Sequence, residues 1–149
     1  MRTRFHQPPV ERAVAAFSRL GEHSMVWFAL SGAGAALDRR RRAEWVRAGA
    51  VVAASYVANQ AVKFAVRRPR PTMLDLPPLT ATMSNRSYPS NHATTCGAAA
   101  VAYDDLLPPP LLWPFTVAMT LTRPYLGVHY PSDSVAGYAL GVAVAQIAG

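Results

Sequence analysis

The chain has little cysteine, few acidic residues and few charges of either sign. Cys96 is the single cysteine among 149 residues, which excludes an intrachain disulfide and suggests a small core residue. Lys and Arg number 15 against 8 Asp and Glu, and the net charge of +7 raises nucleic acid as a partner. No nucleic-acid motif is present, however, and nearly all the cations are arginines at the ends of apolar runs. We therefore expect no nucleic-acid partner and interpret these arginines as anchors at lipid headgroups.

The chain also has no long hydrophobic run. No uncharged stretch reaches the roughly 18 apolar residues of a clear membrane span, although 51% of the residues are hydrophobic. The shorter runs are apolar all round, whereas the helices of a soluble bundle carry a charged outer face. We expect an all-α, membrane-embedded bundle of about five transmembrane helices, with a soluble helical bundle as the alternative. The helices are expected over residues 24–37, 44–66, 90–103, 111–122 and 132–149.

The N-terminal segment shows no targeting signal. Met1–Arg12 is basic and is followed by no apolar segment, so we expect no cleavable signal peptide. Residues 9–20 have the pattern of a short amphipathic helix, and residues 1–22 are expected to lie at the membrane interface. Residues 71–89 form a long loop without periodicity, and loops of this length are often functional. We expect a single membrane domain over residues 1–149, with residues 71–89 as its active-site loop.

Three short motifs fall at the expected helix ends. The first runs from Lys63 to Pro71, the second from Pro89 to His92, and the third from Thr122 to Asp133. In an up-and-down bundle, the end of the second span, the start of the third helix and the loop between the fourth and fifth lie at one membrane face. Helix order alone therefore predicts that the three motifs form one site.

Cations in these motifs suit a phosphoryl group. Lys63, Arg70 and Arg123 supply fixed positive charge, which stabilises the negative charge spread over the oxygens of a phosphoryl group in transit. Taken alone, each is better explained as an anchor whose charge reaches the headgroups. Three further arginines are assigned only to that anchor class: Arg67, Arg68 and Arg86.

The remaining motif residues supply a hydroxyl, two imidazoles and a carboxylate. Ser90 opens a helix, where free N–H groups favour phosphate, and its hydroxyl either contacts phosphate or caps the helix. His129 and Asp133 are four residues apart. A carboxylate bonded to Nδ1 would fix the tautomer and leave Nε2 free to attack phosphorus. His92 can protonate the leaving oxygen and then activate water. This set predicts a phosphomonoester hydrolase with a histidine nucleophile and no metal or other cofactor.

Together these residues resemble the signature of the type 2 phosphatidic acid phosphatase superfamily. Its motifs are Lys-x6-Arg-Pro, Pro-Ser-x-His and Ser-Arg-x5-His-x3-Asp, and residues 63–137 match them with the same internal spacing. Thr122 replaces the usual Ser. The resemblance implies a helical bundle and metal-independent hydrolysis through a phosphohistidine, with His129 as nucleophile, Asp133 as its orienter and His92 as acid and base. It also implies that the phosphate is held by Lys63, Arg70, Ser90 and Arg123.

Hydrolysis of a lipid-linked phosphate is the leading hypothesis within this superfamily. The small size and the stretch before the first span resemble the decaprenylphosphoryl-5-phosphoribose phosphatases. Undecaprenyl-diphosphate, phosphatidate and phosphatidylglycerophosphate phosphatases remain alternatives, as does a vanadium haloperoxidase. A non-catalytic lipid-binding scaffold is the hypothesis from another class. Asn91, Glu22 and His23 are possible substrate contacts, although Glu22 and His23 are equally well explained as a helix start.

The positions of the arginines indicate how the protein is oriented in the membrane. The Arg39–Arg42 turn and Arg47 favour a cytoplasmic position for that turn, with the site facing outward from a bacterial plasma membrane. The basic N-terminal segment argues the reverse, and we favour the outward orientation. Gly137 and Gly141 form a small-residue pattern suited to a helix–helix contact within or between chains, so a homo-oligomer is possible.

Overall fold

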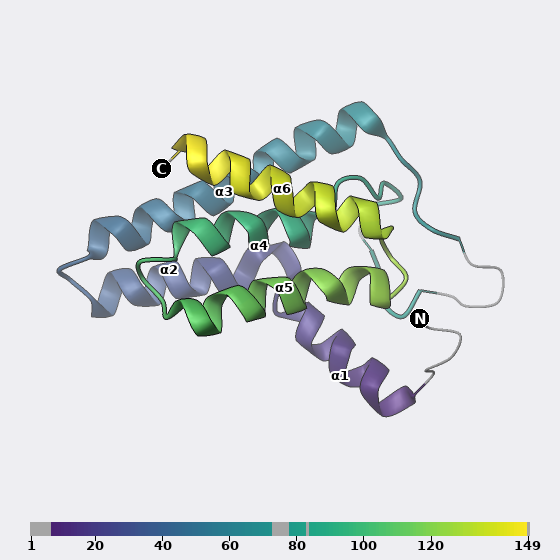
Figure 1. Ribbon diagram of the computed structural model, residues 1–149, viewed down its shortest axis with the longest axis horizontal. Helices are drawn as coiled ribbons and strands as arrows, with labels where there is room; N and C mark the ends of the chain where they lie inside the picture. Colours follow the sequence, from purple (N-terminus) through teal and green to yellow (C-terminus); the bar gives the residue numbers. More distant parts are fainter. Residues whose placement is uncertain (1–6, 73–77, 83, 149) are drawn as a thin grey trace.

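The protein folds into a bundle of helices that run alternately up and down and are joined by loops. The computed structural model describes residues 7–72, 78–82 and 84–148, and Figure 1 shows all its helices lying side by side except the N-terminal one, which leans away. The elements are α1 (Pro8–Arg19), η1 (Glu22–Ser24), α2 (Met25–Leu37), α3 (Arg42–Val66), α4 (Asn91–Ala102), α5 (Pro109–Tyr125) and α6 (Pro131–Ala148). The prediction of an all-α bundle is confirmed.

Helix α4 is the centre of the bundle. All its residues from 92 to 100 are buried, and it packs against α3, α5 and α6. Its sequence is mostly Ala, Thr, Cys and Gly, so neighbouring helices can approach it closely on every side. A Cβ at Gly141 would collide with the Thr94 carbonyl oxygen, and one at Gly137 would lie 2.6 Å from the carbonyl oxygen of Ser90. The contact predicted for Gly137 and Gly141 is therefore made within the chain, between α6 and α4.

Aromatic side chains fill the core between α2, α3 and α4. The ring centroids of Trp27 and Tyr103 are 5.7 Å apart, and those of Trp45 and Tyr103 are 6.1 Å apart. The Tyr103 hydroxyl donates to the Trp27 carbonyl oxygen at 2.8 Å. Nearby, Arg41 Nη1 donates to the carbonyl oxygen of Asp105 at 2.6 Å. That bond ties the α2–α3 turn to the α4–α5 turn, so both turns lie at the same end of the bundle.

Helix α1 leans away from the bundle and touches mainly α5 (Figure 1). The rings of Phe17 and Phe115 meet edge to face with centroids 5.3 Å apart, and Ser18 is buried. The opposite side of α1, including Arg12 and Arg19, is exposed. The amphipathic helix predicted over residues 9–20 is therefore present.

The remaining predicted helices match α2 to α6 apart from small shifts at their ends. Among the described residues, no helix combines the length and the apolar character that a membrane-crossing segment needs. Residues 73–77 and 83 of the predicted active-site loop lie outside the described residues.

Candidate active site

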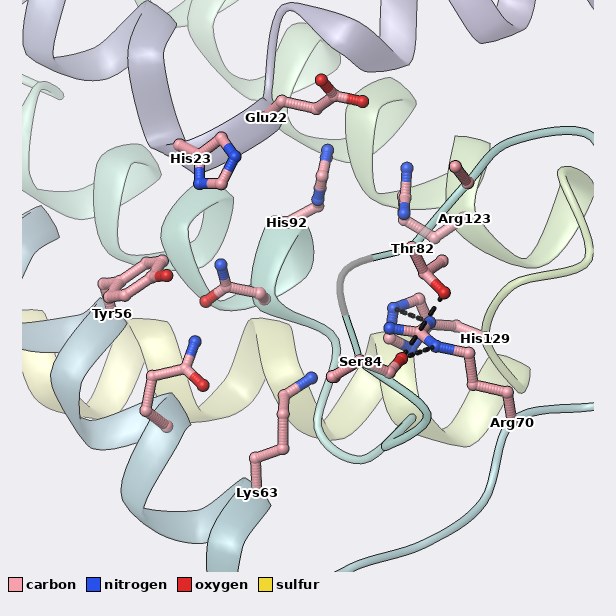
Figure 2. A pocket seen from close by; sticks show the side chains of 13 residues that line it. Glu22, His23, Tyr56, Lys63, Arg70, Thr82, Ser84, His92, Arg123 and His129 are labelled. Carbon is pink, nitrogen blue, oxygen red and sulfur yellow. Dashed lines mark hydrogen bonds between the residues drawn. The ribbon is translucent and has the colours of Figure 1, made fainter.

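The three motifs meet at one cavity of about 520 Å³. It lies at the end of the bundle where α3 finishes, α4 begins and α5 leads into α6 (Figure 2). The site predicted from helix order is therefore assembled. Of the residues singled out in the sequence, the cavity is lined by Glu22, His23, Lys63, Arg70, Asn91, His92, Arg123 and His129. Ala81, Thr82 and Ser84 of the 71–89 loop line it as well.

Three cations reach this cavity from three different segments. Lys63 is buried in the last turn of α3, and Arg123 is buried in the last turn of α5. Arg67 then adopts a left-handed conformation (φ 53°) that ends α3. The chain beyond is held by a bridge between Pro69 and Arg86. This turn brings Arg70 back over the cavity, so its charge joins the other two.

Arg70 and His129 are in direct contact. Arg70 Nη1 lies 3.2 Å from His129 Nε2, and Figure 2 shows the two side chains meeting. A guanidinium can only donate, so Nε2 accepts and its lone pair faces the cavity. The ring proton then belongs on Nδ1. Arg70 also donates to the carbonyl oxygens of Val128 and Ser84, both at 2.7 Å.

Asp133 lies behind His129. Its Oδ2 is 3.6 Å from His129 Nδ1, which is longer than a hydrogen bond but close enough for attraction, and such contacts often tighten when substrate binds. Asp133 Oδ2 also accepts the Tyr130 backbone N–H at 2.9 Å, which fixes the carboxylate at the start of α6. The side chain of Asp133 is fully buried and does not line the cavity.

Burial and charge keep His129 neutral. Burial lowers the pKa of His129 to about 4 against the opposing effect of Asp133, and the charges of Arg70 and Arg123 lower it further. A neutral imidazole with Nε2 unprotonated is the form that can attack an electrophile.

Arg68 is a second partner of Asp133 that the sequence pattern assigned only to an anchor role. Its Nη1 donates to Asp133 Oδ1 at 2.9 Å and to Ser132 Oγ at 2.9 Å. Its guanidinium also stacks over the ring of Tyr130 at 4.0 Å. The anchor interpretation of Arg68 therefore misses its contact with the site. No signal in the spacing of the first motif distinguishes Arg68 from its neighbour Arg67.

Ser18 of α1 joins two site residues. Arg123 Nη1 donates to Ser18 Oγ at 2.8 Å, and His92 Nε2 lies 3.1 Å from the Ser18 carbonyl oxygen. Because a carbonyl only accepts, Nε2 of His92 carries the proton. Thr122 Oγ1 lies 3.1 Å from Ser18 Oγ, so the hydroxyl retained at position 122 has a role in this contact. Sequence reasoning missed Ser18 because its motif partners are more than 70 residues away.

Ser90 is placed differently from Lys63, Arg70 and Arg123, the other residues expected to hold the phosphate. It is fully buried, and it does not line the cavity. It precedes α4 without making a side-chain cap, and its hydroxyl has no partner among the described residues. Its backbone N–H donates to the Asp133 carbonyl oxygen at 3.0 Å, which joins the start of α4 to the start of α6.

Tyr56 and Gln60 line the cavity from outside the three motifs and the 71–89 loop, and the sequence pattern had not singled them out. They precede Lys63 on α3 by seven and three residues, and this spacing places all three on one face of the helix. That periodicity is a signal from which both could have been found.

The chain is similar to known proteins along most of its length. The model of the PAP2 superfamily matches residues 44–148. A decaprenylphosphoryl-5-phosphoribose phosphatase from Mycolicibacterium smegmatis is 41% identical over 133 residues, which cover 88% of this chain and 73% of that protein. The protein with that name from Mycobacterium tuberculosis H37Rv is 38% identical over 141 residues, 95% of this chain and 80% of that protein.

More distant proteins agree with these matches. A lipid A 1-phosphatase from Rhizobium etli is 36% identical over 99 residues, 61% of this chain and 42% of that protein. The fold matches the crystal structure of a transmembrane PAP2-type phosphatidylglycerolphosphate phosphatase from Bacillus subtilis. The TM-score is 0.80 at 23% identity, and the match covers 97% of this chain and 77% of that one. The resemblance found in the three motifs is thus confirmed, and the chain belongs to the PAP2 superfamily and is a phosphatase.

Proposed function

We propose that this phosphatase removes the terminal phosphate from a polyprenyl-linked substrate, decaprenylphosphoryl-5-phosphoribose or a close analogue. The name of the relatives that are 41% and 38% identical over most of both chains supports this substrate. One structural observation supports the chemistry most directly. The unprotonated Nε2 of His129 faces a cavity that also receives Lys63, Arg70 and Arg123.

The proposed reaction has two steps. His129 Nε2 attacks phosphorus, the bond to the leaving oxygen breaks, and His92 gives that oxygen a proton. His92 would enter this step as the imidazolium and give the proton on Nδ1, while its Nε2–H stays bonded to the Ser18 carbonyl oxygen. Water, deprotonated by His92, then attacks the phosphohistidine and releases phosphate and neutral His129. Asp133 stabilises the positive imidazole formed in the first step.

The cations and Ser90 have a binding role in this proposal. Lys63, Arg70 and Arg123 would neutralise the oxygens of the phosphoryl group as charge develops on them. Arg70 contacts His129 in the substrate-free site, so the entering phosphate would take over that guanidinium. Ser90 lies at the start of α4, and its hydroxyl, which has no partner among the described residues, would help to bind the phosphate there.

The bundle is proposed to lie in a bacterial plasma membrane as about five spans, α2 to α6, with α1 at the interface. The apolar outer surface of these helices supports this placement, because large hydrophobic side chains there face outward. They include Phe28, Val46, Val57, Phe64, Trp113, Val117, Leu121, Val135 and Ile147. A substrate with a polyprenyl tail would then stay in the bilayer while its headgroup enters the cavity.

Phosphate release by purified protein in detergent, with EDTA present, tests the proposal. The substrates are decaprenylphosphoryl-5-phosphoribose, undecaprenyl diphosphate and phosphatidate. We expect release that survives EDTA, is fastest with the phosphoribose lipid, and disappears in His129→Ala. His6→Ala, at a histidine outside the described residues, is the matched control.

Other outcomes would point elsewhere. Faster release from undecaprenyl diphosphate or phosphatidate would replace the proposed substrate. Loss of activity with EDTA would contradict the metal-independent mechanism. No release from any lipid by folded protein would favour the non-catalytic scaffold, and vanadate-dependent halide oxidation would favour a haloperoxidase.

A further inference from the structure

The cavity has two chemically different ends. Figure 2 shows Arg70 and His129 at one end and Glu22, His23 and Tyr56 at the other, with His92 between. The first end is cationic and suits the phosphoryl group. The second end carries a carboxylate, an imidazole and a phenol from η1 and α3, and the proposed phosphate chemistry uses none of these groups.

The position of His92 indicates what enters the second end. In an in-line displacement the leaving oxygen lies on the side of phosphorus opposite the nucleophile. His129 is the proposed nucleophile and His92 the proposed donor to the leaving oxygen. The group attached to that oxygen therefore extends from His92 toward Glu22, His23 and Tyr56.

The side chains at this end suit hydroxyl groups. A carboxylate such as Glu22 can accept from two hydroxyls, and an amide such as Gln60 can both donate and accept. Asn91 Oδ1 is buried and has no hydrogen-bond partner among the described residues, so it lacks a donor that a hydroxyl would supply. A second phosphate here would face the negative charge of Glu22, and an acylated glycerol would leave these acceptors unpaired.

The backbone of η1 is shaped to hold this end of the cavity in place. A Cβ at Gly21 would lie 2.8 Å from His92 Cδ2, so glycine lets the turn approach His92. His23 and Ser24 then adopt left-handed conformations with φ of 51° and 60°. This conformation is unfavourable for a residue with a side chain, and such strain is concentrated at functional sites.

We infer that Glu22, Gln60 and Asn91, together with His23 and Tyr56, form a subsite that binds the hydroxyl groups of a sugar carrying the phosphate to be removed. This inference rests on the proposed function, and it gives a structural reason why the substrate would be a phosphoribose lipid. The subsite distinguishes a phosphorylated sugar from a diphosphate or a glycerolipid phosphate by its hydroxyls, next to the bond that is broken.

The test compares substrates within each variant. For the wild type, Glu22→Gln and Gln60→Leu, kcat/KM is measured with decaprenylphosphoryl-5-phosphoribose and with phosphatidate. We expect the ratio of the two values to fall about tenfold or more in each variant, the effect of one lost hydrogen bond to a charged or buried group. Glu44→Gln, a carboxylate at the far end of α3 that binds Arg41, should leave the ratio unchanged.

A modified substrate provides the second arm. The analogue whose ribose lacks its 2- and 3-hydroxyls should be a poorer wild-type substrate than the parent lipid, and Glu22→Gln should no longer distinguish the two. Equal losses with both lipids, or equal wild-type rates with and without the hydroxyls, would overturn the subsite and leave the proposed function standing. Wild-type preference for phosphatidate over the phosphoribose lipid would overturn both.

Discussion

At the scale of single residues, the Asp133 carboxylate is shared by two partners. Oδ1 accepts from Arg68 at 2.9 Å, and Oδ2 faces His129 at 3.6 Å. Arg68 also bonds Ser132 and stacks on Tyr130, so it is held in place itself. Arg68 does not line the cavity, so we expect it to affect catalysis through the residues that it holds, chiefly Asp133. We therefore regard Arg68 as a positioning residue.

Arg68→Ala should lower kcat about 10- to 100-fold, because a charge-assisted hydrogen bond to a buried carboxylate is lost. KM should change by less than roughly threefold, since no contact to substrate is removed. Steady-state kinetics on the phosphoribose lipid measures both values. Arg68→Lys should recover part of kcat, and Arg67→Ala is the control, because among the described residues the Arg67 side chain bonds the Phe64 carbonyl oxygen of α3 and no site residue. A rise in KM at constant kcat would mean that Arg68 binds substrate instead.

The neutral state of His129 predicts how stability depends on pH. The pKa of His129 falls from 6.5 to about 4 in the folded protein, chiefly through burial. Between these values the unfolded chain binds a proton that the folded protein does not, so stability decreases as pH falls from 6.5 to 4. The contribution is about 3 kcal/mol over this window. Melting temperatures of wild type and His129→Gln are measured in detergent from pH 7 to pH 4, and that of the wild type should fall further than that of the variant. The same dependence of melting temperature on pH in both proteins would contradict a neutral His129 in the folded state.

The sequence predicted most of the residues that line the cavity because their chemistry and their motif spacing agree. Ser18 and Arg68 could not be predicted in this way. Ser18 reaches Arg123 and His92 only because α1 folds back on the end of α5. The role of Arg68 depends on the left-handed turn at Arg67, which no local residue preference specifies.

At the scale of elements, the contact between α4 and α6 positions two motifs relative to each other. Gly97, Gly137 and Gly141 face backbone atoms of the opposite helix at this contact. The same contact includes the bond from the Ser90 N–H to the Asp133 carbonyl oxygen. Close packing here therefore sets the distance between the second and third motifs.

Gly141→Ala should destabilise the protein by about 1–3 kcal/mol, the usual cost of overpacking. The added Cβ would collide with the Thr94 carbonyl oxygen, and backbone cannot move aside as a side chain can. Thermal unfolding in detergent measures the change. Gly32→Ala is the matched control, because a Cβ there meets nothing within 4 Å and alanine favours the helix. A Gly141→Ala protein as stable as Gly32→Ala would show that the two helices are less tightly packed.

The helices were predictable from apolar runs and from the breaks between them. The charged turn over residues 38–42 separates two helices, and Pro71 and Pro108 mark places where a helix cannot continue. The observed helix ends lie close to them. The tilt of α1 could not be predicted, because it depends on the edge-to-face contact of Phe17 with Phe115 on a distant helix.

In the whole molecule, the arginine-rich α2–α3 turn and the cavity lie at opposite ends of the bundle. The α2–α3 turn carries Arg39 to Arg42 and is tied to Asp105 in the α4–α5 turn. The cavity lies where the other helix ends meet. If the basic turn is cytoplasmic, the cavity opens on the outer side of the membrane.

A protease site inserted after Arg39 tests this orientation. We expect cleavage in inside-out vesicles and protection in intact spheroplasts, because the turn would face the cytoplasm. A site inserted after Thr82, in the loop that lines the cavity, should show the opposite pattern. Cleavage after Arg39 from outside intact spheroplasts would reverse the orientation and place the active site in the cytoplasm.

Trapping the phosphorylated intermediate tests whether His129 is the covalent nucleophile. Protein is mixed with the phosphoribose lipid radiolabelled at its terminal phosphate and quenched in alkali within milliseconds, since phosphohistidine survives base but not acid. We expect acid-labile label on the peptide containing His129 in wild type and in His6→Ala, and no label in His129→Ala. Label on a different residue, or turnover by His129→Ala, would contradict it.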